Sequence, residues 1–199
     1  SCLVGSEMCI RDRIQTEGKD DEESLTQRAE VRFIRALDYY YLIDLYGNVP
    51  FVDENTGIGT YVPERITRAN LYTYIEKELK EIEPQMKAPR ANVYGRADQA
   101  AVWMLLSRLY LNAEVYTGDP QWNACIQECD DIINSGKYSL DINYSDPFKA
   151  HNENSLENIL VIPYDEIFAT GFNYHLAALH GANQKTYDLV GSPWGAGAY

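Results

Sequence analysis

Apolar residues recur with a helical period in four stretches of the chain, and the first runs from about Asp21 to Tyr46. Gly47 follows as a C-terminal cap, and Pro50 prevents the helix from continuing. The apolar residues of this stretch repeat every four positions: Phe33, Leu37, Tyr41 and Leu45. We therefore predict one long helix that buries this stripe, followed by a loop-like stretch from Val49 to Arg65.

A second helix is predicted from about Arg68 to Glu83, because apolar residues again recur at helical spacing. Thr67 is its expected N-terminal cap, and Pro84 ends it. The predicted buried stripe of this helix consists of Leu71, Ile75, Leu79 and Ile82. A linker from Gln85 to Gly95 follows.

The third and fourth helices are predicted as an antiparallel pair. The third spans about Ala97 to Tyr116, and its early alanines allow a close approach of two helix axes. The fourth starts with Asp119 as N-cap and Pro120 at the first helical position, and Gly136 closes it. The short connection between them forces neighbouring helices to run antiparallel, as in a tetratricopeptide-type unit. The two pairs are irregularly spaced, so helical pairs are predicted and a strict 34-residue repeat is not.

Beyond Gly136 the helical period is lost. Asn158 to Tyr164 is short and rich in branched residues, which predicts a buried strand or extended segment. Residues 165–199 are rich in Gly, Ala, Asn and aromatics without a sustained period. The predicted fold class is therefore mainly α, with tetratricopeptide-like helical pairs over residues 14–136. Residues 137–199 form an irregular, loop-rich ligand-binding segment that we expect to be truncated.

The first residues need a separate interpretation. Residues 1–13 (SCLVGSEMCIRDR) lack the basic-then-apolar order of a signal peptide and resemble the translated read of a sequencing adapter. We therefore interpret them as non-native and expect any targeting signal upstream. No run of about 18 apolar residues occurs, so no membrane-spanning helix is predicted.

Charge and tyrosine content narrow the classes of partner. With 17 basic and 30 acidic residues the formal net charge is −13, which repels phosphate backbones and anionic lipid and argues against nucleic-acid or membrane-surface binding. The 16 tyrosines exceed the 5 phenylalanines and 3 tryptophans. Tyrosine suits partly exposed recognition surfaces, although helix–helix packing accounts for most of these residues.

A metal site is not predicted. Cys125 and Cys129 share a helical face, but a structural metal needs two more ligands, and the three histidines show no matching spacing. The two cysteines are therefore expected to be small apolar core residues.

Catalytic motifs are equally lacking in the sequence. It contains no G-x-S-x-G, H-E-x-x-H, G-x-x-x-x-G-K-[ST] or G-x-G-x-x-G pattern. A glycosidase needs two carboxylates held across a sugar ring, and Glu76, Glu78 and Glu81 are expected on a solvent face. We predict a protein that is not an enzyme, while a glycosidase with unrecognised carboxylates remains an alternative.

Carbohydrate binding requires less machinery. The apolar face of a pyranose ring stacks on Trp or Tyr, while amide and other polar groups bond its hydroxyls. Trp194 lies between Pro193 and Gly195, a setting that favours display on a loop, although a structural role covering the helices is an equal alternative. The candidate glycan-binding residues are Tyr174, His175, Asn183, Tyr187, Trp194 and Tyr199, with Gln184 among them in sequence.

Several ordered motifs resemble the SusD/RagB family of outer-membrane lipoproteins. The run RFIRALDYYYLIDLYGNVPF, residues 32–51, resembles the family pattern R-F-x-R-A-L-x-Y-x-x-L-x-x-L-Y-G-x-V-P. The helix YTYIEKELKEI (72–82) and the segment YGRA (94–97) with LLSRLYL (105–111) match the next marks. SGKY (135–138) and ENIL (157–160) match the last ones. Residues 71–118 resemble the starch-binding branch in particular.

This resemblance implies a surface lipoprotein of Bacteroidetes-type bacteria that captures glycans, or in some members peptides. It implies delivery to a SusC-like TonB-dependent transporter, with membrane contact only through a lipid anchor outside this sequence. Starch or another α-glucan is the expected ligand, and no cofactor is required. Structural calcium, as in the starch-binding branch, would find ligands near Glu157, but no EF-hand-like spacing supports it.

The carry-over of site residues is partial. Trp194 lies where the starch-binding branch has an N-G-W motif, whereas this sequence reads Ser192-Pro193-Trp194. An expected tyrosine has no counterpart near Leu179 or His180. A tetratricopeptide-like adaptor that binds a protein or peptide segment stays open as an alternative function.

Overall fold

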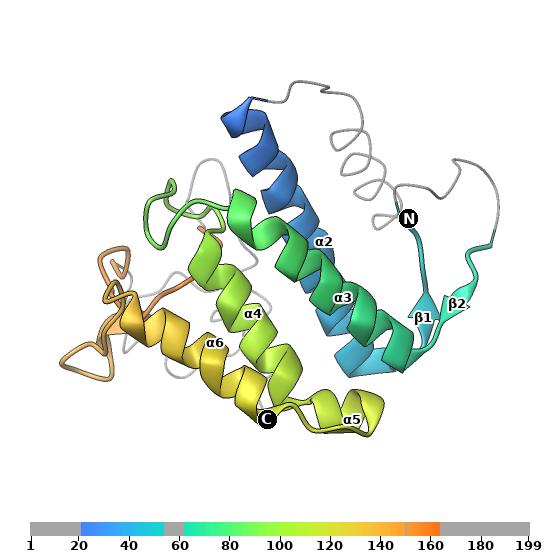
Figure 1. Ribbon diagram of the computed structural model, residues 1–199. Helices are drawn as coiled ribbons and strands as arrows, with labels where there is room; N and C mark the ends of the chain where they lie inside the picture. Colours follow the sequence, from blue (N-terminus) through green and yellow to red (C-terminus); the bar gives the residue numbers. More distant parts are fainter. Residues whose placement is uncertain (1–20, 54–61, 150, 164–199) are drawn as a thin grey trace, which may run out of the picture. The chain divides into compact units, whose positions relative to one another are not determined.

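The structure, a computed structural model, describes residues 21–53, 62–149 and 151–163 (Figure 1). Helices dominate these residues, which confirms the predicted mainly α class. A two-residue antiparallel pair is the only sheet among them, joining β1 (Val49–Pro50) to β2 (Arg65–Ile66). The helices are α2 (Glu22–Tyr46), α3 (Arg68–Ile82), α4 (Gln99–Leu111), α5 (Ala113–Thr117) and α6 (Trp122–Asn134), with 3-10 turns η1 (Glu83–Gln85) and η2 (Asp146–Phe148).

The long helices form two antiparallel pairs. Helix α2 packs mainly on α3, and α4 packs mainly on α6, while α3 also contacts α4 and α5 (Figure 1). The shared core takes apolar side chains from α2, α3, α4 and α5, with Ala124 and Cys125 of α6 packed against its edge. This arrangement confirms the predicted helical pairs.

Helix α2 has the predicted bounds but a different buried face. Asp21 caps it by accepting the Ser24 N–H at 2.8 Å, and Gly47 ends it at a φ of +72°. Of the predicted stripe, Tyr41 and Leu45 are 50% and 69% exposed, whereas Tyr40 and Ile43 are buried. Four residues turn an α-helix by about 400°, so each step drifts about 40° around the axis and a strict four-residue repeat leaves the core.

Helix α3 buries the whole predicted stripe, from Leu71 to Ile82. The Thr67 hydroxyl accepts the Asn70 N–H at 3.3 Å, as expected of an N-cap. Spacings of four, four and three residues keep this stripe on one face, in contrast to the drifting repeat of α2. Pro84 follows in η1, which closes the helix.

The second pair departs from the prediction at three points. Asn112 divides the predicted third helix into α4 and α5. Helix α6 begins at Trp122 behind Gln121, so Asp119 and Pro120 lie before the helix instead of capping it. Both cysteines of α6 are half-buried, and only Cys125 packs against the core.

Of the two predicted alternatives for the run from Asn158 onward, the strand is wrong. Residues 158–163 contain no strand, the chain bends at Ile159 and Leu160, and Ile162 is exposed. Only Ile159 and Leu160 pack against the helical core. A short apolar run does not by itself reveal its conformation, and this one pairs with no neighbouring strand.

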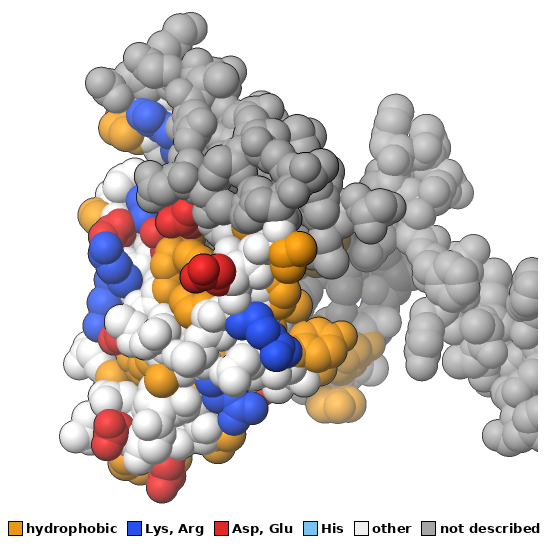
Figure 2. Space-filling view, turned by 90° about the vertical axis from the view of Figure 1, so that its right-hand side faces the viewer, with side chains coloured by type: hydrophobic (Ala, Val, Ile, Leu, Met, Phe, Trp, Pro, Cys, Tyr) orange, Lys and Arg blue, Asp and Glu red, His pale blue; other side chains and the backbone are white. Residues whose placement is uncertain are grey.

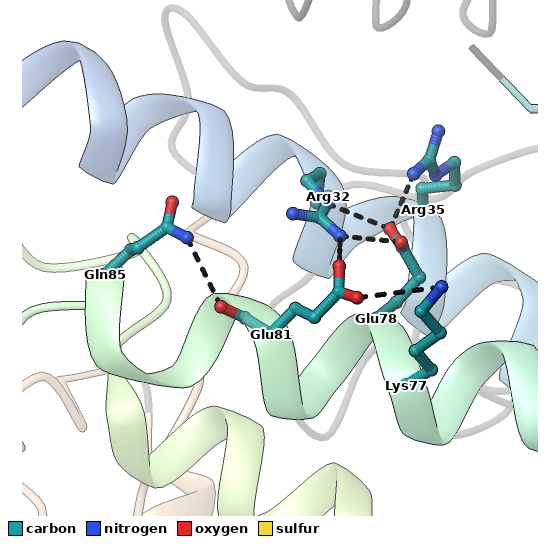
Figure 3. Close-up of polar contacts among 6 residues, drawn as sticks. All are labelled: Arg32, Arg35, Lys77, Glu78, Glu81 and Gln85. Atoms are coloured by element: carbon teal, nitrogen blue, oxygen red, sulfur yellow. Dashed lines mark hydrogen bonds and ion pairs between the residues drawn. The ribbon is translucent and has the colours of Figure 1, made fainter. Parts of the chain in front are cut away.

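Two arginines of α2 bind one buried glutamate of α3 (Figure 3). The Arg32 guanidinium donates to both Glu78 carboxylate oxygens, at 2.6 and 3.0 Å, and Arg35 Nη2 donates to Glu78 Oε2 at 2.5 Å. Arg32 also binds the more exposed Glu81 at 2.7 Å. Glu78 is only 6% exposed, so its predicted place on the solvent face is wrong.

The Glu78 carboxyl depends on both arginines for its charge. Burial by itself would raise its pKa, but the hydrogen bonds from Arg32 and Arg35 outweigh burial and lower that pKa below its ordinary value. A buried charge of this kind is tolerated only when it is paired. The contact therefore sets how α2 and α3 meet along their lengths.

Replacing Glu78 with Gln is expected to destabilise the protein by about 3–5 kcal/mol, because the change removes the buried carboxylate that Arg32 and Arg35 share. The loss should be full near pH 7 and should shrink as pH falls through the lowered pKa of Glu78, where the native carboxylate is itself protonated. Chemical denaturation at several pH values measures both effects. Glu81→Gln is the matched control, since its side chain is 47% exposed and should contribute at most about 1 kcal/mol. Equal losses in the two variants would contradict this role.

Candidate functional site

The predicted glycan-binding residues lie outside the described part of the chain. These are Tyr174, His175, Asn183, Tyr187, Trp194 and Tyr199. Their grouping into one site stays a prediction. The described residues do show which contacts hold residues 137–163, the part of the chain that precedes these candidates in the sequence.

Asp98 is the point at which three parts of the chain meet. It is buried and caps α4, with Oδ1 accepting the Ala101 N–H at 3.2 Å. Its other oxygen accepts the Arg90 backbone N–H at 2.7 Å and the Tyr138 hydroxyl at 3.3 Å. One carboxylate therefore joins the linker before α4, the first turn of α4 and the segment after α6.

Arg90 completes this connection with its side chain. The guanidinium carbon lies 5.4 Å from the centre of the Tyr138 ring, and Nη2 donates to the Ser155 carbonyl at 3.1 Å. Its backbone has a φ of 59°, which is uncommon outside glycine and persists only where surrounding contacts hold it. Burial, followed by the nearby Asp98 charge, raises the pKa of the Tyr138 hydroxyl, so it stays a hydrogen-bond donor.

The segment after α6 is also bonded to itself. Glu157 Oε1 accepts the Asp141 N–H at 2.9 Å, and the Ser155 hydroxyl donates to Asp141 Oδ2 at 2.5 Å. The chain divides into two compact units, residues 1–161 and residues 162–199. These bonds, with those of Asp98, make the irregular segment 137–161 part of the first unit.

Glu157 thus has a structural role in the described residues. Its carboxylate bonds the Asp141 backbone, and no set of three or more His, Cys, Asp or Glu side chains over these residues is arranged to hold a metal ion. The calcium expectation near Glu157 gains no support here. Likewise, none of the described helices is long and apolar enough to cross a bilayer.

The other family marks serve the same structural purpose. Arg96 of the YGRA segment donates to Glu30 of α2 through Nε and Nη2, at 2.9 and 2.7 Å. Asn92 donates to Glu30 at 2.6 Å and to the Ala97 carbonyl at 2.7 Å. The motifs by themselves do not indicate which residues pair with one another. For the contact between α2 and α3, the available signal in the sequence is the pair of arginines three residues apart, together with the acidic residues of the following helix.

Carboxylates also gather where α3, η1 and α6 approach one another. Burial, followed by the charges of Glu83 and Asp131, raises the pKa of Glu128 to about 7. Glu83 accepts the Trp103 indole N–H at 2.8 Å. Glu76 accepts the Tyr110 hydroxyl at 2.9 Å and binds Lys80 at 2.7 Å, so it is not the simple solvent-facing residue that was predicted. A pKa of about 7 for the Glu128 carboxyl is in the range that suits a general acid near neutral pH.

On the face shown in Figure 2, the described residues carry no dominant charge. Hydrophobic, acidic and basic side chains are interspersed there. Such a mixed face lacks the continuous basic field that binding to a nucleic-acid backbone requires. Among the large exposed rings of the described residues, Tyr144 and Phe148 contact each other, with ring centroids 5.4 Å apart.

Curated relatives resemble the chain over most of its length. The starch-binding protein SusD of Bacteroides thetaiotaomicron is 45% identical over 150 residues, 74% of this chain and 26% of that protein. SusD-like protein P25 of Formosa agariphila is 27% identical over 154 residues, 70% of this chain and 26% of its own length. The chain thus spans about a quarter of the length of the curated relatives it matches.

Solved structures share the fold. A SusD superfamily protein from Parabacteroides distasonis superposes with a TM-score of 0.74 at 24% identity, covering 90% of this chain and 39% of that one. Surface glycan-binding protein A from Bacteroides thetaiotaomicron, in complex with laminarihexaose, gives a TM-score of 0.68 at 25% identity and covers 89% of this chain and 38% of its own.

A family model described as starch-binding and associating with the outer membrane matches residues 6–111, just over half of the chain. The match includes both signature arginines, Glu78 and the YGRA segment, whose contacts hold the helices together. Two of the relatives are named for binding starch and glycans. The chain belongs to the SusD-like family of starch-binding, outer-membrane-associated proteins.

Proposed function

We propose that the protein binds a starch-type α-glucan at the cell surface, without cleaving it, and passes it to a SusC-like TonB-dependent transporter. It does so as a lipoprotein of the outer membrane. The observation that carries this proposal is the 45% identity to a starch-binding protein over 150 residues. A second relative is named as binding glycans and was solved with laminarihexaose, at 25% identity, so the choice among glucans has to be measured.

The helical pairs support this function by acting as a frame. Binding residues are commonly placed on irregular segments that a rigid scaffold positions. Here the Asp98 and Arg90 contacts hold residues 137–161 on the helices, and residues 162–199 follow directly. We propose that Trp194 stacks on a sugar ring, with Tyr174, His175, Asn183, Tyr187 and Tyr199 as the other contacts.

Glu128 is the observation that would favour a glycosidase. A carboxyl with a pKa of about 7 suits a general acid, but hydrolysis needs a second carboxylate on the other side of the sugar. After burial, the two acidic neighbours that contribute most to the raised pKa of Glu128 both lie on helical elements. Glu83 follows α3, and Asp131 is one turn further along α6. We therefore assign its raised pKa to helix packing.

Trp194→Ala is expected to weaken glycan binding by about 1–3 kcal/mol, the loss typical of a removed aromatic stacking contact. Affinity electrophoresis of the intact protein in amylopectin, pullulan and other glucans measures it. Trp122→Ala is the matched control, since this half-exposed ring lies on α6. Trp194→Phe should retain part of the binding.

Three results would overturn parts of this proposal. Unretarded migration of the wild-type protein in every glycan would reject glycan binding, and peptide capture in its place would favour the adaptor alternative. Release of reducing sugar would identify an enzyme. Loss of the native circular dichroism spectrum in Trp194→Ala would make Trp194 a structural residue.

Glu128→Gln is expected to stabilise the protein at pH 8 and to change little at pH 4. Because the folded pKa of about 7 lies above the ordinary 4.5, the native state pays a growing electrostatic cost as pH rises between these values. The gain should be roughly 1 kcal/mol, since solvent screens a partly exposed group. Thermal unfolding at both pH values measures it, with the exposed Asp130→Asn on the same helix as control. An effect of equal size at both pH values would contradict the assignment of the raised pKa to helix packing. A sugar-cleaving activity that the wild type has and the variant lacks would contradict it too.

A further inference from the structure

Two aromatic rings are displayed side by side on the turn that contains η2. Tyr144 is 88% exposed and Phe148 is 73% exposed. Their ring centroids are 5.4 Å apart and their planes are inclined by 46°. Neither ring belongs to the core that the helices share. Their position is therefore not explained by packing among the described residues.

The turn that presents these rings is tied by its own hydrogen bonds. The backbone N–H groups of Asp146 and Phe148 donate to the Asn143 and Ser145 carbonyls, at 3.0 and 3.2 Å. The Asn143 side-chain amide donates to Asp146 Oδ2 at 3.1 Å, and Lys149 binds Asp146 Oδ1 at 2.5 Å. Asn152 closes the turn by donating to the Pro147 carbonyl at 2.6 Å. A preorganised turn loses little conformational entropy when a ligand contacts its rings.

The polar groups around the rings indicate an uncharged ligand. Asp146 and Lys149 neutralise each other, and the ammonium lowers the pKa of the Asp146 carboxyl, so the pair stays charged and balanced. Asn143 and the Tyr144 hydroxyl add neutral groups able to bond hydroxyls. An acidic saccharide would be repelled by the net charge of −13. Flat apolar rings with neutral polar groups beside them suit a neutral sugar.

We propose that Tyr144 and Phe148 form a second glycan contact, separate in sequence from the predicted Trp194 site and specific for neutral hexose polymers. The inclined rings stack on the apolar faces of sugar units in one glycan chain. This contact rests on the proposed glycan-binding function. It adds to the retention of long glycans, because two contacts on one protein raise the effective concentration of a polymer at each.

A second explanation for the same exposure is burial against another part of the whole protein. Ile142 is 98% exposed and lies two residues before Tyr144, so a packing surface at this place would include it. A sugar-stacking surface would use the rings and not this aliphatic side chain. The two explanations therefore predict different effects for Ile142 and Phe148.

The test uses the intact protein in affinity electrophoresis with amylopectin as the probe. Tyr144→Ala and Phe148→Leu should each reduce retardation about five-fold or more, the lower end of the loss expected for one stacked ring. Phe148→Trp keeps a ring and should keep the retardation. Ile142→Ser is the matched control and should migrate as the wild type does. Thermal unfolding should be unchanged in all four variants.

The outcomes separate this contact from the proposed function. If the wild type is retarded and Phe148→Leu is retarded equally, the second contact is rejected while glycan binding stands. If the wild type is retarded in no glycan, glycan binding itself fails and the second contact fails with it. A lowered unfolding temperature in both Ile142→Ser and Phe148→Leu would identify a packing surface and reject the sugar contact.

Discussion

The first helical pair depends on one buried carboxylate. Glu78 of α3 receives hydrogen bonds from Arg32 and Arg35 of α2, and its charge persists in the interior only because both arginines are present. Apolar attraction is non-directional, so by itself it selects the alignment of two helices less sharply than a hydrogen bond does. A bidentate charged contact is geometrically selective, so it favours one alignment of the two helices. The core residues on both sides of the contact then meet in a single arrangement.

Similar polar contacts hold segments that lack regular structure against the helices. Glu30 binds Arg96, and Asp98 binds both the Arg90 backbone and Tyr138. A chain of turns cannot satisfy its backbone groups by itself, so it needs partners on the helices. These contacts attach the segment from Tyr138 to Glu157 to the scaffold, and the second compact unit begins at residue 162. The family motifs are thus largely the residues that hold the frame together.

A helical frame that is distinct from the irregular segments is consistent with a binding protein whose ligands differ among relatives. One relative is named for starch, and another was solved with laminarihexaose. A frame held by internal charges tolerates changes on irregular segments, where binding residues are commonly placed. The exposed pair of Tyr144 and Phe148 lies on such a segment, tied by its own hydrogen bonds and outside the shared core. On the proposed function, ligand preference can therefore change without any change to the helices.

The sequence by itself determined the bounds of the first two long helices and the family, because period, caps and ordered motifs are local properties. It placed the ends of α2 and the buried apolar stripe of α3 correctly. Only the tertiary structure decided that Tyr41 and Leu45 face outward, that residues 158–163 form no strand, and that Glu78 is buried. Each of these depends on which distant residue lies opposite. The charge of Glu78 is a reason for exposure in the sequence and becomes a reason for burial only when Arg32 and Arg35 are across from it.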